Sequence, residues 1–212
     1  MEFLPPLLLA YCEAHSEQES ALLQKLNRDT HVKVPSARML SGHLQGRILK
    51  LLVQLVGAEQ VLEIGTYTGY SALCLAEGLP DHGLVTTIDP NEETNFFATK
   101  YFNESEHGNK IKLLEGKAVD IIPTLEQSFD VIFIDADKRS YQQYFELCID
   151  KVRKGGIIIV DNVLWSGKVI DEKAQDTDTT LIRAFNDSVC SDARVQALML
   201  PVRDGLLLLR RL

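Results

Sequence analysis

The stretch Val61-Leu-Glu-Ile-Gly-Thr-Tyr-Thr-Gly69, followed by Tyr70-Ser71, decides the fold. Its apolar start is typical of a buried strand, and a helical pattern begins near Tyr70. Gly65 and Gly69 permit a tight turn between strand and helix. Such a turn at the first strand–helix junction is typical of a ligand-binding α/β sheet. Taken alone, the pattern is equally consistent with a tight turn that binds nothing.

Strands and helices alternate from residue 60 onward. The predicted strands are 60–64, 84–88, 111–115, 130–134 and 156–160. The predicted helices between them are 70–78, 91–105, 117–126 and 140–153. This alternation predicts a parallel, doubly wound sheet with right-handed crossovers.

The end of the sequence has a different pattern. Residues 177–189 have helical spacing, and the apolar runs 194–200 and 205–210 flank the short turn Pro201-Val-Arg-Asp204. Two strands joined by so short a turn pair antiparallel. We therefore expect seven strands with one reversed, which differs from the six-stranded parallel fold that binds dinucleotides.

The first 56 residues precede this alternation. Helix-period apolar positions occur at 16–28 and 41–56, with Ser41 as a suitable N-cap and 31–36 as an irregular connector. No linker, repeat or low-complexity tract divides the 212 residues. We expect a single domain over 1–212, with 1–56 as a helical segment that covers the site and 57–212 as a Rossmann-like core.

Composition and charge restrict the class of protein. Hydrophobic residues make up 45% and charged residues 25%, with a net charge of −8, which disfavours a nucleic-acid partner. Cys12, Cys74, Cys148 and Cys190 lack Cys-x-x-Cys spacing and indicate free thiols in a reducing compartment. Residues 1–12 lack the basic leader of an export signal, and no stretch approaches about 20 apolar residues. We expect a cytoplasmic protein with no membrane segment.

Polar side chains follow two predicted strands directly. Asp135 follows the fourth strand, and Asp161 and Asn162 follow the fifth. Because the carboxyl ends of parallel strands meet, these oxygens are expected to form a site that suits magnesium or calcium. Such residues are also common turn formers, but a cation would offset their crowded charge. Lys138 is a candidate proton acceptor, and a simple ion pair with Asp135 or Asp137 is the alternative.

The first two strand ends favour a nucleoside ligand. Tyr67 stands where a dinucleotide fingerprint has the glycine that admits a pyrophosphate. A ligand without phosphates, such as S-adenosylmethionine, fits better, with Glu63 near its cationic amino acid end. Asp89 lies 20 residues beyond Gly69, where an acidic residue typically binds ribose hydroxyls. Capping of the helix that begins at Pro90 is the alternative role for Asp89.

Together these residues resemble the cation-dependent O-methyltransferases of the caffeoyl-CoA and catechol type. The resemblance is carried by 61–72, by 133–138 with Tyr141, and by 161–165, and it extends from about Met39 to Gly205. It implies the Rossmann-like class I methyltransferase fold. In that fold a seven-stranded, mostly parallel sheet has a reversed last strand and helices on both faces. It also implies S-adenosylmethionine as the methyl donor, and a homodimer.

The resemblance also implies roles for individual residues. The cofactor would be bound by Gly42, Glu63, Gly65, Thr66, Gly69, Ser71, Asp89, Ala118 and Asp135. A divalent cation, Mg²⁺ before Ca²⁺ or Mn²⁺, would be bound by Asp135, Asp161 and Asn162. Lys138 would be the general base, with Asp135 as the second catalytic residue.

The acceptor implied by the resemblance is a small aromatic molecule with a vicinal diol, methylated on one hydroxyl. Trp165, in the polar loop 164–180, is a candidate wall for a planar substrate. His43-Leu44-Gln45 departs from the Asp-Ala-Lys of the animal catechol enzymes, so the substrate stays open. Methylation of hydroxylated uridine in transfer RNA and a non-catalytic S-adenosylmethionine-binding protein are the alternatives. The missing middle glycine and the late hairpin disfavour a nicotinamide oxidoreductase.

Overall fold

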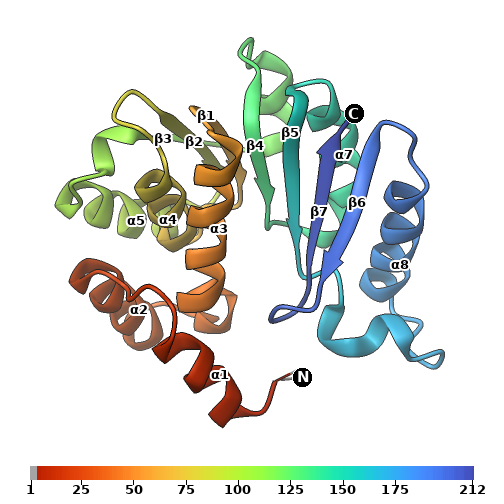
Figure 1. The fold of residues 1–212 in the computed structure, drawn as a ribbon, viewed down its shortest axis with the longest axis horizontal. Helices are drawn as coiled ribbons and strands as arrows, with labels where there is room; N and C mark the ends of the chain where they lie inside the picture. Colours follow the sequence, from red (N-terminus) through yellow and green to blue (C-terminus); the bar gives the residue numbers. More distant parts are fainter. Residues whose placement is uncertain (1–3) are drawn as a thin grey trace.

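A seven-stranded sheet forms the centre of the computed structural model, which describes residues 4–212 (Figure 1). The strands are β1 (Gln60–Ile64), β2 (Leu84–Asp89), β3 (Ile111–Glu115), β4 (Phe129–Ile134), β5 (Val152–Asp161), β6 (Val195–Leu200) and β7 (Leu206–Arg211). Their order is β3-β2-β1-β4-β5-β7-β6. The first five strands pair in parallel, whereas β7 pairs antiparallel with both β5 and β6. The predicted fold, including the reversed last strand, is confirmed.

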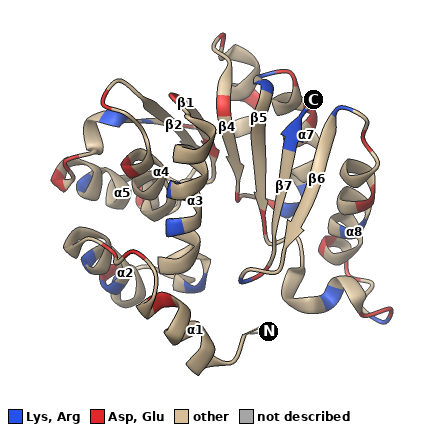
Figure 2. Cartoon of the chain, in the orientation of Figure 1, with Lys and Arg blue, Asp and Glu red and all other residues tan. Residues whose placement is uncertain are grey.

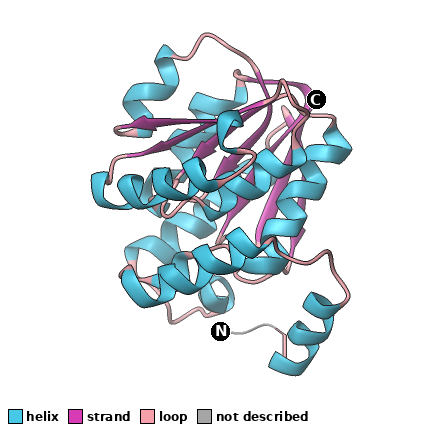
Figure 3. Cartoon of the chain, turned by 90° about the vertical axis from the view of Figure 1, so that its left-hand side faces the viewer, coloured by secondary structure: helices cyan, strands magenta, loops and turns pink. Residues whose placement is uncertain are grey.

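Helices cover both faces of this sheet (Figures 1 and 3). On one face lie α3 (Gly42–Val56), α4 (Tyr70–Gly78) and α5 (Glu92–Glu104). On the other lie α6 (Ala118–Ile121), α7 (Tyr141–Ile149) and α8 (Thr177–Cys190). Both faces of β1 and β4 are therefore buried, as the continuous apolar runs of these strands indicate.

Two helices precede the sheet, and their bounds differ from the prediction. The helix α1 (Pro6–Ala14) buries none of its residues and projects from the body (Figure 3). The helix α2 (Ala21–Lys33) begins after Ser20, whose side chain caps it, and not at residue 16. It continues through the first half of the predicted connector 31–36 because the first helix breaker is Pro35, which keeps Val34 extended. Residues 1–3 of the predicted N-terminal segment lie outside the described residues.

Other boundaries also differ from the prediction. Ser41 occupies the predicted N-cap position of α3, but its side chain makes no capping hydrogen bond. The predicted helix 117–126 is one turn, α6, followed by the 3-10 turn η3 (Ile122–Thr124), because Pro123 interrupts it. The helix α7 ends at Ile149, and β5 starts at Val152 instead of residue 156. The remaining 3-10 turns are η1 (Ala37–Met39), η2 (Gly108–Lys110), η4 (Lys138–Ser140) and η5 (Trp165–Ile170).

The turn after β1 lies against the end of β4. A Cβ atom on Gly65 would lie 2.0 Å from the carbonyl oxygen of Asp135, and the φ of Gly65 is +102°. Only glycine fits both the backbone conformation and this close approach. The residues that directly follow β1 and β4 are therefore in contact with each other. None of the helices within residues 4–212 is long and apolar enough to cross a membrane.

We expect Gly65→Ala to lower the free energy of unfolding by about 2–5 kcal/mol, because backbone strain and overpacking add. Urea denaturation measures the change. Gly57→Ala is the matched control: Gly57 has a φ of +63° but no atom within 4 Å of its added Cβ. That control should cost only about 1 kcal/mol. Equal losses in the two variants would contradict the importance of the contact with Asp135.

Candidate active site

Four of the predicted site residues meet at the ends of β4 and β5. The Nζ atom of Lys138 lies 3.0 Å from Oδ1 of Asp135 and 2.6 Å from Oδ1 of Asn162. Asp161 lies next to Asn162, and the backbone amide of Asn162 donates to Oδ1 of Asp161 over 2.7 Å. The ammonium of Lys138 thus binds two of the oxygens predicted to hold a metal. The ion pair considered as the alternative for Lys138 is present.

Burial and like charge perturb Asp161. Its side chain is 3% exposed, and burial, followed by the charge of Asp135, raises its pKa to about 7. Hydrogen bonds from Gln45 and the backbone of Asn162, with the charge of Lys138, oppose this shift. The hydroxyl of Tyr141 also donates to the carbonyl oxygen of Asp161 over 2.9 Å. A cation beside the two carboxylates would favour their ionised forms.

The donor set fits a hard divalent cation. Two carboxylates and one amide oxygen are ligands that magnesium and calcium accept. Within residues 4–212, no group of three or more His, Cys, Asp or Glu side chains is arranged to hold a metal. A site with three protein ligands here therefore requires the amide oxygen of Asn162. The left-handed backbone of Asn162, with a φ of 60°, is of the kind that asparagine tolerates more readily than most residues.

A buried polar chain lies at the ends of β1 and β2. The hydroxyl of Thr87 is 2.5 Å from Oε2 of Glu63 and 2.6 Å from the hydroxyl of Thr66. Glu63 is fully buried, and burial raises its pKa to about 8 although the Ser71 and Thr87 hydroxyls act in the opposite direction. Its second oxygen, Oε1, is buried and has no hydrogen-bond partner. A buried acceptor without a donor fits a cationic ligand group, as predicted for Glu63.

Asp89, at the end of β2, binds the turn that follows β1. Its carboxylate accepts hydrogen bonds from the backbone amides of Tyr67, at 3.0 Å, and Asn91, at 2.9 Å. The side chain that caps α5 is Asn91, so the alternative role of Asp89 as the helix cap is wrong. The amide of Gly116 donates to the carbonyl of Asp89 over 3.1 Å, which brings the start of α6, with Ala118, beside the end of β2.

Two further predicted cofactor residues, Gly69 and Gly42, lie at the starts of different helices. Gly69, with a φ of +87°, precedes α4, and a Cβ atom there would lie 2.6 Å from the ring of Phe102, so its hydrogen is needed for packing. Gly42 begins α3, with a φ of +74°, and an added Cβ would lie 3.3 Å from Nη1 of Arg203. Gly42 therefore lies beside Arg203 of the β6–β7 turn, and its role in binding the cofactor stays a prediction.

Two features of the site could not be predicted from the sequence. The side chain of Gln45, on α3, donates from Nε2 to Oδ2 of Asp161 over 2.7 Å, across 116 positions of sequence. The turn between β6 and β7 holds two loops: Arg203 donates to the carbonyl of Leu40 over 2.7 Å, and the Asp204 carbonyl accepts from Leu164 over 2.9 Å. The backbone amide of Ser166 also donates to the Asp204 carboxylate.

Trp165 lies in the loop that this turn holds. Trp165 and Ser166 both have left-handed backbones, with φ of 48° and 54°. Such strain in residues other than glycine is often found at functional sites. The indole N–H of Trp165 is buried and has no acceptor. Trp165 follows Asn162 by three positions in the chain, and its role as a substrate wall stays a prediction.

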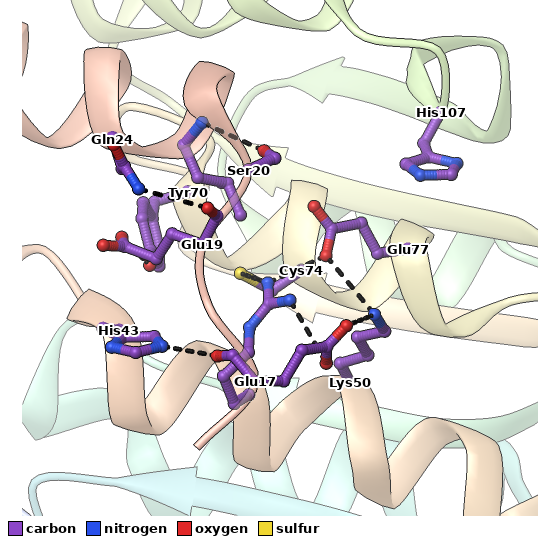
Figure 4. A network of polar contacts seen from close by, with 12 residues as sticks. Glu17, Glu19, Ser20, Gln24, His43, Lys50, Tyr70, Cys74, Glu77 and His107 are labelled. Atoms are coloured by element: carbon purple, nitrogen blue, oxygen red, sulfur yellow. Dashed lines mark hydrogen bonds and ion pairs between the residues drawn. The ribbon is translucent and has the colours of Figure 1, made fainter. Parts of the chain in front are cut away.

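Two hollows in the described residues lie away from this site. One of about 240 Å³ is bordered by Leu23, Leu73, Glu77 and His107, and one of about 420 Å³ lies on α2. Beside the first, a polar network ties the connector before α2 to α3 and α4 (Figure 4). Its Lys50 binds Glu17 at 2.5 Å, and Arg47 binds Glu77 at 2.8 Å. These contacts account for the network structurally, and neither hollow contains a predicted site residue.

The order of the strands, with β7 reversed between β5 and β6, and the polar residues at the strand ends define a class I methyltransferase. A family model described as O-methyltransferase matches residues 13–212. The "Probable caffeoyl-CoA O-methyltransferase 1" of Dictyostelium discoideum is 35% identical over 211 residues, which cover 97% of this chain and 92% of that protein. The maize "Caffeoyl-CoA O-methyltransferase 2" is 37% identical, covering 87% of this chain and 74% of that protein.

Solved structures agree with these relatives. An O-methyltransferase from Bacillus cereus in complex with SAH is 30% identical, with a TM-score of 0.88 and coverage of 96% of both chains. The chain belongs to the O-methyltransferase family. The prediction of an enzyme of this family is confirmed, whereas the roles of the individual site residues stay predictions.

We expect the ligand-free protein to lose stability as the pH rises from about 6 to 8. Glu63 has a pKa of about 8 when folded and an ordinary value of 4.5, so between these values the folded state binds one more proton. Stability therefore falls with pH, by at most about 1.4 kcal/mol per unit from this group. Glu63→Gln should remove that part of the slope in urea denaturation. Glu115→Gln, at an exposed residue, is the control, and an unchanged slope in Glu63→Gln would refute the assignment.

Proposed function

We propose that the chain transfers the methyl group of S-adenosylmethionine to one hydroxyl of a vicinal diol on a small aromatic molecule, with a divalent cation bound. The observation that carries this proposal is the arrangement of Asp135, Asp161 and Asn162 beside Lys138. Mg²⁺ is the first choice of metal, with Ca²⁺ and Mn²⁺ as alternatives. The names of the relatives support a phenolic acceptor, and the SAH complex of the Bacillus protein supports the donor.

In this proposal, different residues bind the metal, accept the proton and orient the methyl donor. Asp135, Asp161 and Asn162 would hold the cation, which when bound would lower the pKa of a coordinated hydroxyl. Nζ of Lys138, which lies between two of these oxygens, would accept the proton of that hydroxyl after it has itself lost one. Glu63 and the Gly65–Gly69 turn would orient the methyl donor from the neighbouring strand. Such alignment of two reactants contributes up to about 7–11 kcal/mol to catalysis.

The distribution of charged residues bears on whether the chain binds nucleic acid. In the view of Figure 2, Lys and Arg are interspersed with Asp and Glu and form no basic stripe, which agrees with the charge of −8 and disfavours transfer RNA.

Leu51 and Leu55 on α3 are exposed by 54% and 73%, and Leu7 on α1 by 87%. Their exposure supports the proposed homodimer, in which a second copy would cover them. The cytoplasmic location stays a prediction.

The first test is methyl transfer from S-adenosylmethionine to a panel of small catechols, with magnesium or with EDTA. We expect turnover that EDTA removes. Turnover that persists in EDTA would contradict the metal dependence. Tight binding of S-adenosylmethionine without turnover of any catechol would redirect the search to transfer RNA, whose binding would weaken steeply with salt, or to a non-catalytic role.

Two variants separate the metal ligands from the base. We expect Asp161→Ala to abolish metal-dependent turnover, because it removes a buried ligand. Lys138→Met should lower kcat by about 10²–10⁴-fold, which is the usual contribution of a general base, and should leave binding of S-adenosylmethionine unchanged. Steady-state kinetics and titration calorimetry measure both effects. Full activity in Asp161→Ala would refute the metal role of that residue.

A further inference from the structure

Gln45, on α3, makes a long-range polar contact with Asp161 in the candidate site. Its Nε2 donates to Oδ2 of Asp161 over 2.7 Å, while the backbone amide of Asn162 donates to Oδ1 of the same carboxylate over 2.7 Å. Both oxygens of Asp161 are therefore held by one hydrogen bond each. The rotation of the carboxylate is fixed from two directions, one within its own loop and one from α3. Gln45 and Asp161 are 0% and 3% exposed, so water does not replace either contact.

The position of Gln45 is itself fixed by packing. The next residue, Gly46, lies so close to α4 that an added Cβ would be 2.6 Å from Sγ of Cys74 and 2.9 Å from the ring of Tyr70. One residue further, Arg47 is 7% exposed and pairs with Glu77 at 2.8 Å. These contacts prevent rotation or sliding of α3 at this point. The amide of Gln45 is thus aimed at Asp161 before any ligand arrives.

The orientation of the Gln45 amide follows from the charge of its partner. With Asp161 ionised, the NH₂ group faces the carboxylate, because the opposite orientation would place two acceptor oxygens against each other. The remaining Oε1 of Gln45 is buried and has no partner. Leaving this acceptor unpaired is unfavourable, and the hydrogen bond that Nε2 donates to a charged group offsets that cost. A neutral donor also steadies the carboxylate without adding positive charge that would repel a cation.

We propose that Gln45 is a positioning residue for the metal: its amide holds Asp161 in the orientation that binds a divalent cation and so raises the affinity of the site. This inference rests on the proposed metal-dependent function. Groups that orient metal ligands in this way typically change metal affinity by 10–100-fold when removed. Gln45 would act through Asp161 without touching the metal or the substrate.

The test is Mn²⁺ binding to the purified full chain, followed by electron paramagnetic resonance. We expect Gln45→Met, which keeps the length of the side chain but removes the donor, to weaken Mn²⁺ binding by about 10–100-fold. Its affinity for S-adenosylmethionine, measured by calorimetry, should stay that of the wild type. Gln54→Met makes the same chemical change at an exposed residue of the same helix and should bind Mn²⁺ as the wild type does.

Wild-type Mn²⁺ affinity in folded Gln45→Met would overturn the proposal, since a merely structural glutamine would lower the melting temperature and leave the metal affinity unchanged. If Gln45→Met does not fold, Gln45→Asn, whose amide is one methylene too short to reach Asp161, is measured with the same expectations. Asp161→Ala separates the two hypotheses. Loss of Mn²⁺ binding in that variant supports the proposed metal site, and retained binding would refute the site itself.

Discussion

Crowding of two buried carboxylates, Glu63 and Asp161, with the half-buried Asp135 at the ends of β1, β5 and β4 is the constraint on which the candidate site depends. Burial raises the pKa of Glu63 to about 8 and, together with the charge of Asp135, that of Asp161 to about 7. The packing that creates this crowding is rigid, because the Gly65 turn touches the carbonyl of Asp135. The ligand-free fold therefore holds acidic groups in a state that cationic ligands would relieve. Binding and stability are coupled through the same few atoms.

The sequence predicted the parts of this arrangement that follow from local pattern and from sheet geometry. Short apolar runs identified the strands, and the rule that parallel strands end together brought Asp135 and Asp161 close without any knowledge of the register. The helix boundaries were less accurate, because capping by Ser20 and interruption by Pro123 shift ends by a few residues. Glycine spacing predicted the position of the first turn. It did not predict the contact between Gly65 and the end of β4, which is why glycine is needed there.

The contact between Gln45 and Asp161 lay beyond such reasoning. It depends on how far α3 is rotated about its axis, and that rotation is set by the closeness of Gly46 to α4. The bracing of two loops by Arg203 and Asp204 likewise depends on tertiary packing, although their turn was predicted from the sequence. The candidate site residues at the strand ends could be found from the sequence. The residue that contacts them from α3 could be found only from the packed helices.

The antiparallel insertion of β7 has a consequence for biosynthesis. Leu206 pairs with Asp161, and the carbonyl of Gly205 accepts from Val163, so the backbone around the metal candidates is completed by residues translated after every other part of the site. Until Gly205 and Leu206 leave the ribosome, β5 is an unpaired edge of the sheet. Its polar end then lacks the backbone contacts that these two residues make with Val163 and Asp161. The nascent chain can form the Gly65–Gly69 turn early, but the end of the sheet that bears the candidate site closes only when β7 is added.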